Sequence, residues 1–258
     1  MAKIPQRIIS RLDVKSNNVI KGVHLEGLRI IGDPNTLALK YYNSGIDEII
    51  YMDVVASLYG RNNIFNVVKK AAKDIFVPLT VGGGIRKIQD ITSALRHGAD
   101  KVAINTQALK YPEFLSLASK TFGNQCIVLS IEAKRRGNSK WEALTDNGRE
   151  KTGVDVTDWA REAVKLGAGE ILLTSVDQEG TKKGFDIELI DEVSSNVNIP
   201  VIACGGAGSS NHIEDMLVKT KINAICCASL FHYNILSVED LKKYLKQKSF
   251  DVRLDYKS

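Results

Sequence analysis

Long apolar runs, metal-binding cysteine patterns and blocks of one charge are all scarce in this 258-residue sequence. No stretch approaches ~18 uncharged apolar residues, so the sequence predicts no membrane-spanning helix. The first seven residues lack the apolar core of a secretory signal, which favours a cytoplasmic protein. The four cysteines lie in or beside apolar runs without CxxC or Cys/His spacing. We therefore expect buried free thiols and no metal site.

The charges are numerous but evenly mixed. Thirty-five Lys and Arg residues against 30 Asp and Glu residues give a net charge of +5. No basic block carries interleaved aromatic residues, so nucleic-acid binding is not expected, and the mild positive charge suits an anionic small molecule. A hydrophobic fraction of 44% is ordinary for globular proteins. The length suits either two modest domains or one closed α/β barrel.

Short β-branched runs alternate with amphipathic stretches along the whole chain. Eight runs predict strands: 7–9, 48–52, 78–81, 101–104, 126–129, 170–173, 200–203 and 224–227. Between them, segments such as 64–72 and 159–164 show apolar residues at helical spacing. Asp33-Pro34 is typical of a helix start. Eight such units predict a (β/α)8 TIM barrel, because the alternative open, doubly wound sheet normally has one early phosphate loop.

The two halves of the sequence resemble each other. Asp13 aligns with Glu132, Glu48 with Glu170, and Gly82 with Gly205, at separations of 119, 122 and 123 residues. The sequence therefore predicts one barrel domain over 1–258 with a twofold repeat, its half-barrels spanning about 1–123 and 124–258. A duplicated half-barrel places two equivalent sets of groups at the C-terminal face, where barrel enzymes perform their chemistry. Two similar anion sites suit a substrate phosphorylated at both ends.

Glycines follow strands in both halves. Backbone N–H groups of such loops approach and bind phosphate oxygens. The sequence predicts one phosphate cradle from Gly82, Gly83, Asn105 and Thr106, and a second from Gly205, Gly206, Ala228 and Ser229.

Carboxylates follow the predicted strands. Asp13 and Glu132 are expected on opposite sides of the barrel mouth, where they could act as acid and base if their environments separate their pKa values. Asp53 and Asp177 are further candidates for orienting substrate. A structural role, in capping a loop or pairing with a lysine, remains the alternative for each.

A set of motifs distributed over nearly the whole chain resembles the cyclase subunit of imidazole glycerol phosphate synthase. They are Arg7-Ile8-Ile9, Leu12-Asp13-Val14-Lys15, Val19-Ile20-Lys21-Gly22, Gly32-Asp33-Pro34, Val81-Gly82-Gly83-Gly84-Ile85, Gly98-Ala99-Asp100-Lys101, Gly167 to Ser175, Gly205-Gly206-Ala207-Gly208 and Ala228 to His232.

This resemblance implies an enzyme of histidine biosynthesis that needs no cofactor. Ammonia from a glutaminase subunit, expected as a one-to-one heterodimer partner, passes through the barrel. It reacts with a phosphoribulosyl-formimino aminoimidazole carboxamide ribotide to give imidazole glycerol phosphate and an aminoimidazole carboxamide ribotide. Asp13 and Glu132 fall on the two catalytic positions, and Lys21 on a substrate-contacting lysine. The expected substrate-binding set is completed by Thr174, Asp177 and Gly180.

Four charged residues match the family's ammonia gate at the N-terminal end of the barrel. Arg7, Glu48, Lys101 and Glu170 each lie at a predicted strand start and together form a neutral set. A structural ring of salt bridges is the alternative. If this end of the barrel only needed to be filled, apolar side chains would serve equally well. The presence of four charged residues therefore favours a docked ammonia source.

Three positions depart from the family pattern. Glu132 replaces an Asp, Ser10-Arg11 replaces Pro-Cys or Ala-Cys, and Glu179 replaces an Asp. Arg11 is two residues before Asp13, so its side chain is expected to point into the barrel and could lower the pKa of Asp13 or Glu132. The alternative hypothesis is therefore a paralogue that channels ammonia for acetamidino sugars of bacterial surface polysaccharides, with or without cyclase activity.

Overall fold

Eight parallel strands close into a barrel in the computed structural model, which describes residues 5–56 and 64–254. The barrel strands are β1 (Arg7–Lys15), β4 (Glu48–Asp53), β5 (Leu79–Gly82), β6 (Lys101–Ile104), β7 (Ile127–Arg135), β10 (Glu170–Ser175), β11 (Val201–Cys204) and β12 (Ala224–Cys227). They pair in the order β10-β11-β12-β1-β4-β5-β6-β7, and pairing of β10 with β7 closes the ring. The predicted TIM barrel is confirmed, and all eight predicted runs are barrel strands.

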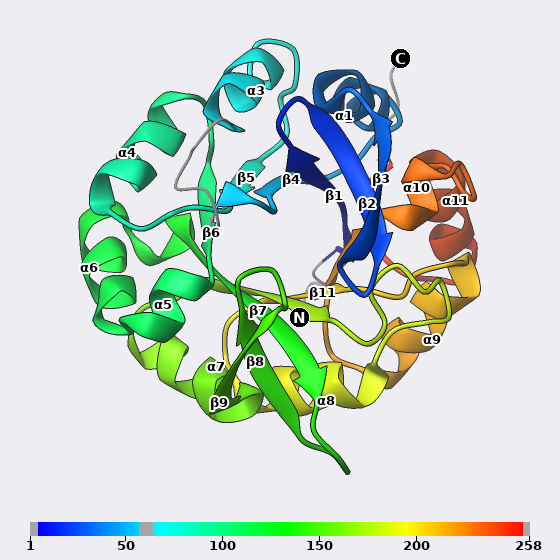
Figure 1. Ribbon diagram of the computed structural model, residues 1–258. Helices are drawn as coiled ribbons and strands as arrows, with labels where there is room; N and C mark the ends of the chain where they lie inside the picture. The colour runs from blue at the N-terminus through cyan, green and yellow to red at the C-terminus, as the bar shows by residue number, and fades with distance from the viewer. Residues whose placement is uncertain (1–4, 57–63, 255–258) are drawn as a thin grey trace.

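Helices surround the strands on the outside (Figure 1). They are α1 (Pro34–Asn43), α3 (Ile64–Ala71), α4 (Ile88–Arg96), α5 (Thr106–Lys110), α6 (Glu113–Phe122), α7 (Val156–Lys165), α8 (Ile187–Asn196), α9 (Ser210–Lys219), α10 (Ser229–His232) and α11 (Val238–Gln247), with a 3-10 turn at Asn124–Cys126. The start of α1 agrees with the sequence, because the Asp33 side chain accepts a hydrogen bond from the Thr36 N–H and Pro34 occupies the first turn.

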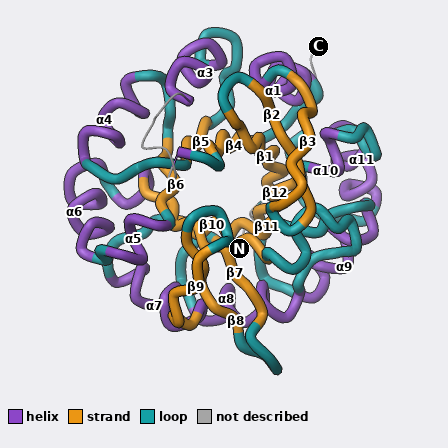
Figure 2. The backbone as a smooth tube through the Cα atoms, in the orientation of Figure 1, coloured by secondary structure: helices purple, strands orange, loops and turns teal. Residues whose placement is uncertain are grey.

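Two antiparallel hairpins extend the barrel strands at equivalent places in the two halves (Figure 2). One, β2 (Asn18–Val23) and β3 (Glu26–Gly32), follows β1; the other, β8 (Trp141–Thr145) and β9 (Glu150–Asp155), follows β7. From sequence alone, the polar segment 134–153 after the fifth predicted strand indicates a hairpin or a loop, whereas residues 18–32 give no such indication. Asp13 and Glu132 consequently precede the last residues of β1 and β7, because both strands run on into their hairpins.

The interior of the barrel is packed. Inward-facing apolar residues include Ile9, Ile50, Val128, Leu172 and Ile202, each at most 1% exposed. A larger cluster fills the space between the outer faces of the strands and the helices. All four cysteines are buried free thiols, as predicted. Within the described residues, no helix is both long enough and apolar enough to span a membrane.

Candidate active site

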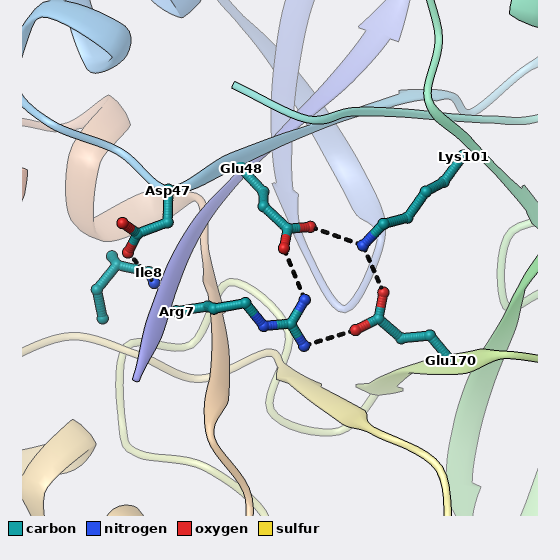
Figure 3. Close-up of polar contacts among 6 residues, drawn as sticks. All are labelled: Arg7, Ile8, Asp47, Glu48, Lys101 and Glu170. Atoms are coloured by element: carbon teal, nitrogen blue, oxygen red, sulfur yellow. Dashed lines mark hydrogen bonds and ion pairs between the residues drawn. The ribbon is translucent and has the colours of Figure 1, made fainter. Parts of the chain in front are cut away.

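The four predicted gate residues form a closed ring of ion pairs at the strand starts (Figure 3). Arg7 donates to Glu48 and to Glu170 at 2.6 Å each, and Lys101 donates to the same carboxylates at 3.0 and 2.9 Å. The acids are nearly buried, whereas the Arg7 and Lys101 side chains remain 25% and 18% exposed. The ring therefore sits at the boundary between solvent and the barrel interior.

The carboxylates of the ring stabilise the protonated forms of Arg7 and Lys101. Burial by itself lowers the pKa of Arg7, but the Glu170 and Glu48 carboxylates outweigh it and raise that pKa. The same balance raises the pKa of Lys101. Each carboxylate is shared by two cations, so the four groups form a network rather than isolated pairs.

Asp13 is held between two cations near the opposite end of β1. Its Oδ1 accepts a hydrogen bond from Arg11 Nε at 2.7 Å, and its Oδ2 lies 3.5 Å from Lys21 Nζ on β2. Burial raises the pKa of Asp13, but Arg11 and Lys21 oppose this and lower it overall. Asp13 is accordingly an ionised carboxylate although only 5% exposed.

Glu132 lies on β7, four positions around the barrel from β1, and meets a different environment. Its Oε2 accepts hydrogen bonds from Asn105 Nδ2 at 3.0 Å and from the Gly148 N–H at 2.7 Å, both of them neutral donors. Burial raises the pKa of Glu132 to about 7, with Arg11 only partly opposing it. The two carboxylates therefore differ in protonation near neutral pH, which is the separation that acid–base work requires.

Lys21 ties the first hairpin to the loop after β10. Its ammonium forms a buried ion pair with Glu179, in addition to its approach to Asp13. The His24 N–H donates to the Glu179 carbonyl at 2.8 Å, and a Cβ on Gly180 would come within 2.2 Å of the Gly22 carbonyl oxygen. Gly180, with φ +74°, thus permits the close contact between hairpin and loop.

The first predicted cradle borders an open cavity beside Glu132. The cavity measures about 210 Å³ and is lined by Gly83, Asn105, Thr106 and Lys110, among others. Gly83 has φ +93°, and a Cβ there would approach the Asp53 carbonyl oxygen to 2.1 Å, so only glycine suits this turn. Gly82 ends β5 next to it. The Asn105 side chain holds Glu132, so backbone groups of this loop remain for an anion.

The second predicted cradle is much tighter. Gly205, Gly206, Ala228 and Ser229 line it together with Glu179 and Gly180. Gly205 and Gly206 both have positive φ, and the buried Ser229 Oγ has no hydrogen-bond partner among the described residues. An unpaired buried hydroxyl is a group that a phosphate oxygen can satisfy. Glu179, one of the residues lining this cradle, is the carboxylate that pairs with Lys21.

Three other predicted residues are engaged by neighbouring groups, and one of them, Asp53, lines the same cavity as Gly83 and Glu132. The Asp53 carboxylate accepts a hydrogen bond from the Val55 N–H, and burial raises its pKa. Asp177 pairs with Lys134 and accepts from the Arg135 N–H, which anchors the second hairpin. The Thr174 hydroxyl accepts from Arg11 Nη1 at 3.1 Å inside the barrel.

The sequence did not indicate two contacts that shape the site. Gly148, which donates to Glu132, lies in the turn of the second hairpin, and no local pattern shows that this turn folds back over β7. The pairing of Tyr41 Oη with His232 Nδ1 at 2.7 Å was also missed. Burial lowers the pKa of His232 to about 4, so its imidazole is neutral.

The fold and the arrangement of its site are those of a (β/α)8-barrel enzyme with paired carboxylates at the C-terminal face. A family model described as "Histidine biosynthesis protein" matches residues 7–237.

Three relatives share the name "Imidazole glycerol phosphate synthase subunit HisF". The one from Legionella pneumophila is 64% identical over 202 residues, covering 78% of this chain and 95% of the relative. That of Dehalococcoides mccartyi is 48% identical over 250 residues, covering 97% and 98%, and that of Clostridium botulinum is 47% identical over 252 residues, covering 97% and 100%. The chain belongs to the HisF family, the cyclase subunits of imidazole glycerol phosphate synthase.

This membership confirms the resemblance, the enzyme class and the role in histidine biosynthesis that the sequence predicted. The relatives are named as subunits, so the family works in complex with a partner subunit. The names support the cyclase hypothesis, and none of them supports the polysaccharide alternative.

Proposed function

We propose that this chain cyclises a phosphoribulosyl-formimino aminoimidazole carboxamide ribotide with ammonia, giving imidazole glycerol phosphate, an aminoimidazole carboxamide ribotide and one molecule of water. The main support for this proposal is the pair of buried carboxylates on opposite strands. Asp13 is held ionised, and Glu132 has a pKa of about 7. Addition of ammonia to the ribulosyl ketone needs one group to take a proton and another to give one. Asp13 performs the first task and Glu132 the second.

The two glycine cradles hold the two phosphates of this substrate. The cradle of Gly82, Gly83, Asn105 and Thr106 lies beside Glu132, and that of Gly205, Gly206, Ala228 and Ser229 lies across the barrel mouth. Their location on opposite sides suits a substrate that spans the mouth. Lys21 lies between Asp13 and Glu179 and is placed to contact the substrate. Asp53, Thr174, Asp177 and Gly180 support this arrangement through contacts to the surrounding strands and loops.

Ammonia enters through the charged ring at the other end. Arg7, Glu48, Lys101 and Glu170 form a closed ring of ion pairs at the strand starts (Figure 3). Ammonia from a glutaminase subunit docked on this face therefore enters the interior when one of these ion pairs opens. The expected complex is a one-to-one heterodimer. Co-expression with the glutaminase subunit of an imidazole glycerol phosphate synthase tests this complex. The measurements are the molecular mass of the purified species and its glutamine-dependent turnover. Isolation of the chain alone in every case would count against the docking proposal.

Cyclisation with ammonium salt at alkaline pH tests the reaction without the partner. Wild type is expected to convert the ribotide, Asp13→Asn to lose the activity, and Glu132→Asp to retain part of it. A displacement near 1 Å can cost about a hundredfold in rate, and the shorter side chain moves the carboxylate by such an amount. Asp158→Asn, on the exposed surface of α7, is the matched control. Absence of activity in well-folded wild type that still binds the ribotide would refute the proposal.

Growth of a histidine auxotroph that lacks the cyclase separates the two functions in cells. Rescue by this chain supports the biosynthetic reaction. Failure of a well-expressed chain favours the ammonia-channelling alternative.

We further propose that residues 1–258 form a single domain built from half-barrels at about 1–123 and 124–258. Pairing of β6 with β7 and of β1 with β12 joins the halves through continuous sheet. One cooperative unfolding transition in urea is the expected result, and two separate transitions would contradict it.

A further inference from the structure

Arg11 is the largest side chain that the barrel buries completely, at 1% exposure. It lies on β1 between Arg7 of the ring and Asp13 of the site, with its side chain on the same inner face as both. Its Nη1 reaches Thr174 on β10, three strands away in the sheet. The guanidinium is thereby anchored beneath the carboxylates by a contact on the far side of the interior.

The contacts of Arg11 distinguish between the two carboxylates. Arg11 Nε donates to Asp13 at 2.7 Å, whereas Glu132 receives hydrogen bonds only from the amide groups of Asn105 and Gly148. Among the described residues, no cation lies within ion-pair distance of Glu132. Two buried carboxyls of similar exposure thus differ chiefly in whether a guanidinium touches them.

One donor of Arg11 is left unused. Its Nη2 is buried and has no hydrogen-bond partner among the described residues. One Nη2–H lies on the same edge of the planar guanidinium as the Nε–H that binds Asp13, the edge that can grip both oxygens of a carboxylate. Lys21 presently lies near the second Asp13 oxygen.

We infer that Arg11 is a positioning residue, which keeps Asp13 ionised and oriented as the proton acceptor and leaves Glu132 as the proton donor. The inference rests on the proposed cyclase function and assigns to this chain's Arg11 a role in it. Other charged or titratable groups also surround Asp13 and enter the balance: Lys21, Glu132, Glu179, Cys204, Cys226 and His232. Of these only Lys21 contacts Asp13 as a cation, and Lys21 is expected to bind substrate.

Arg11→Met and Arg11→Lys test the assignment. The first removes the charge at similar length, and the second restores it. Arg96→Met, in the last turn of α4, removes an exposed arginine as the control. Ammonia-dependent cyclisation is measured from pH 6 to 9 at a fixed concentration of uncharged ammonia, so that the titration of ammonia itself does not enter the profile.

Without the guanidinium, Asp13 resembles Glu132 as a buried carboxyl and protonates more readily as pH falls. We expect Arg11→Met to lose about tenfold or more of its rate at pH 6, with the deficit shrinking toward pH 9. Arg11→Lys recovers part of the loss. An equal deficit of Arg11→Met at every pH would show a merely structural role and overturn the inference.

Carbon-13 NMR titration of the carboxyl groups decides the point independently of turnover, with Asp13→Asn and Glu132→Gln used for assignment. The Asp13 resonance is expected to titrate at higher pH in Arg11→Met than in wild type, and an unchanged midpoint would overturn the inference. If Arg11→Met does not fold, Thr174→Val loosens the same guanidinium and is expected to move the midpoint in the same direction. A wild type without cyclase activity refutes the proposed function, while the NMR result still decides the role of Arg11.

Discussion

Replacement of Glu132 by Gln is expected to stabilise the protein at pH 8. Glu132 is buried, at 5% exposure, and burial raises its pKa from 4.5 to about 7. Its native form therefore holds a proton more tightly than the unfolded chain does. The stability that this proton contributes is present below pH 4.5 and is lost as pH rises toward 7. Glutamine cannot ionise, and its side-chain oxygen still accepts from Asn105 and Gly148.

The size of the effect follows from the pKa difference. A rise from 4.5 to about 7 corresponds to roughly 3 kcal/mol of stability lost by wild type once Glu132 is ionised. Glu132→Gln does not undergo this loss. Its free energy of unfolding should therefore exceed that of wild type by an amount that grows between pH 5 and 8 and levels off above pH 8. The variant should at the same time be a poor cyclase, because it cannot donate a proton.

Urea unfolding at pH 5, 6, 7 and 8 measures the difference. Glu150→Gln is the matched control, since Glu150 is exposed on β9 of the hairpin that also supplies Gly148. The control should differ from wild type by less than about 0.5 kcal/mol at every pH. A Glu132→Gln advantage that is the same at pH 5 and pH 8 would refute the reasoning, because it would show that Glu132 does not titrate in this range.

Four further predictions concern the ring, a cradle and the buried histidine. Lys101→Met should destabilise the barrel by about 1–3 kcal/mol in urea unfolding relative to Lys69→Met, at an exposed position of α3, because two charge-assisted hydrogen bonds are lost; equal stability of the two variants would contradict it. Gly206→Ala should lower affinity for inorganic phosphate by calorimetry, because Gly206 has φ +102° and a Cβ would approach the Gly184 carbonyl oxygen to 1.9 Å; Gly32→Ala, which has space, should not. Tyr41→Phe should cost about 1–3 kcal/mol of stability by leaving His232 Nδ1 unpaired. The stability of wild type relative to His232→Gln should fall as pH drops from 6.5 toward 4, because folded His232 resists protonation whereas Glu132 titrates in both proteins. A difference between the two that does not change with pH would contradict this.

Much of the architecture could be predicted from the sequence because its physical cause is local. β-branched runs, helical spacing and the Asp33-Pro34 start are each determined by neighbouring residues, and all eight predicted strands occur in the barrel. The repeat of the motifs also predicted that Asp13 and Glu132 lie on opposite strands. The first hairpin was missed, because residues 18–32 carry no clear alternation and are held by pairing with β1.

The chemistry of the site depended on contacts between distant residues. The sequence showed that Arg11 shares a face with Asp13, but both carboxylates remained possible partners. The structure selects Asp13, since Thr174, 163 residues further along the chain, anchors the guanidinium beside it. The Gly148 N–H reaches Glu132 only because the second hairpin folds back over β7.

By itself, then, the sequence determined the barrel, its duplication and the identity of the charged residues at both ends, because periodicity and strand position express local preferences of the chain. Only the tertiary structure decided which carboxylate is ionised and which holds a proton near neutral pH. A pKa depends on burial and on charges within a few ångströms, and these neighbours come from strands and loops that only the closed barrel brings together.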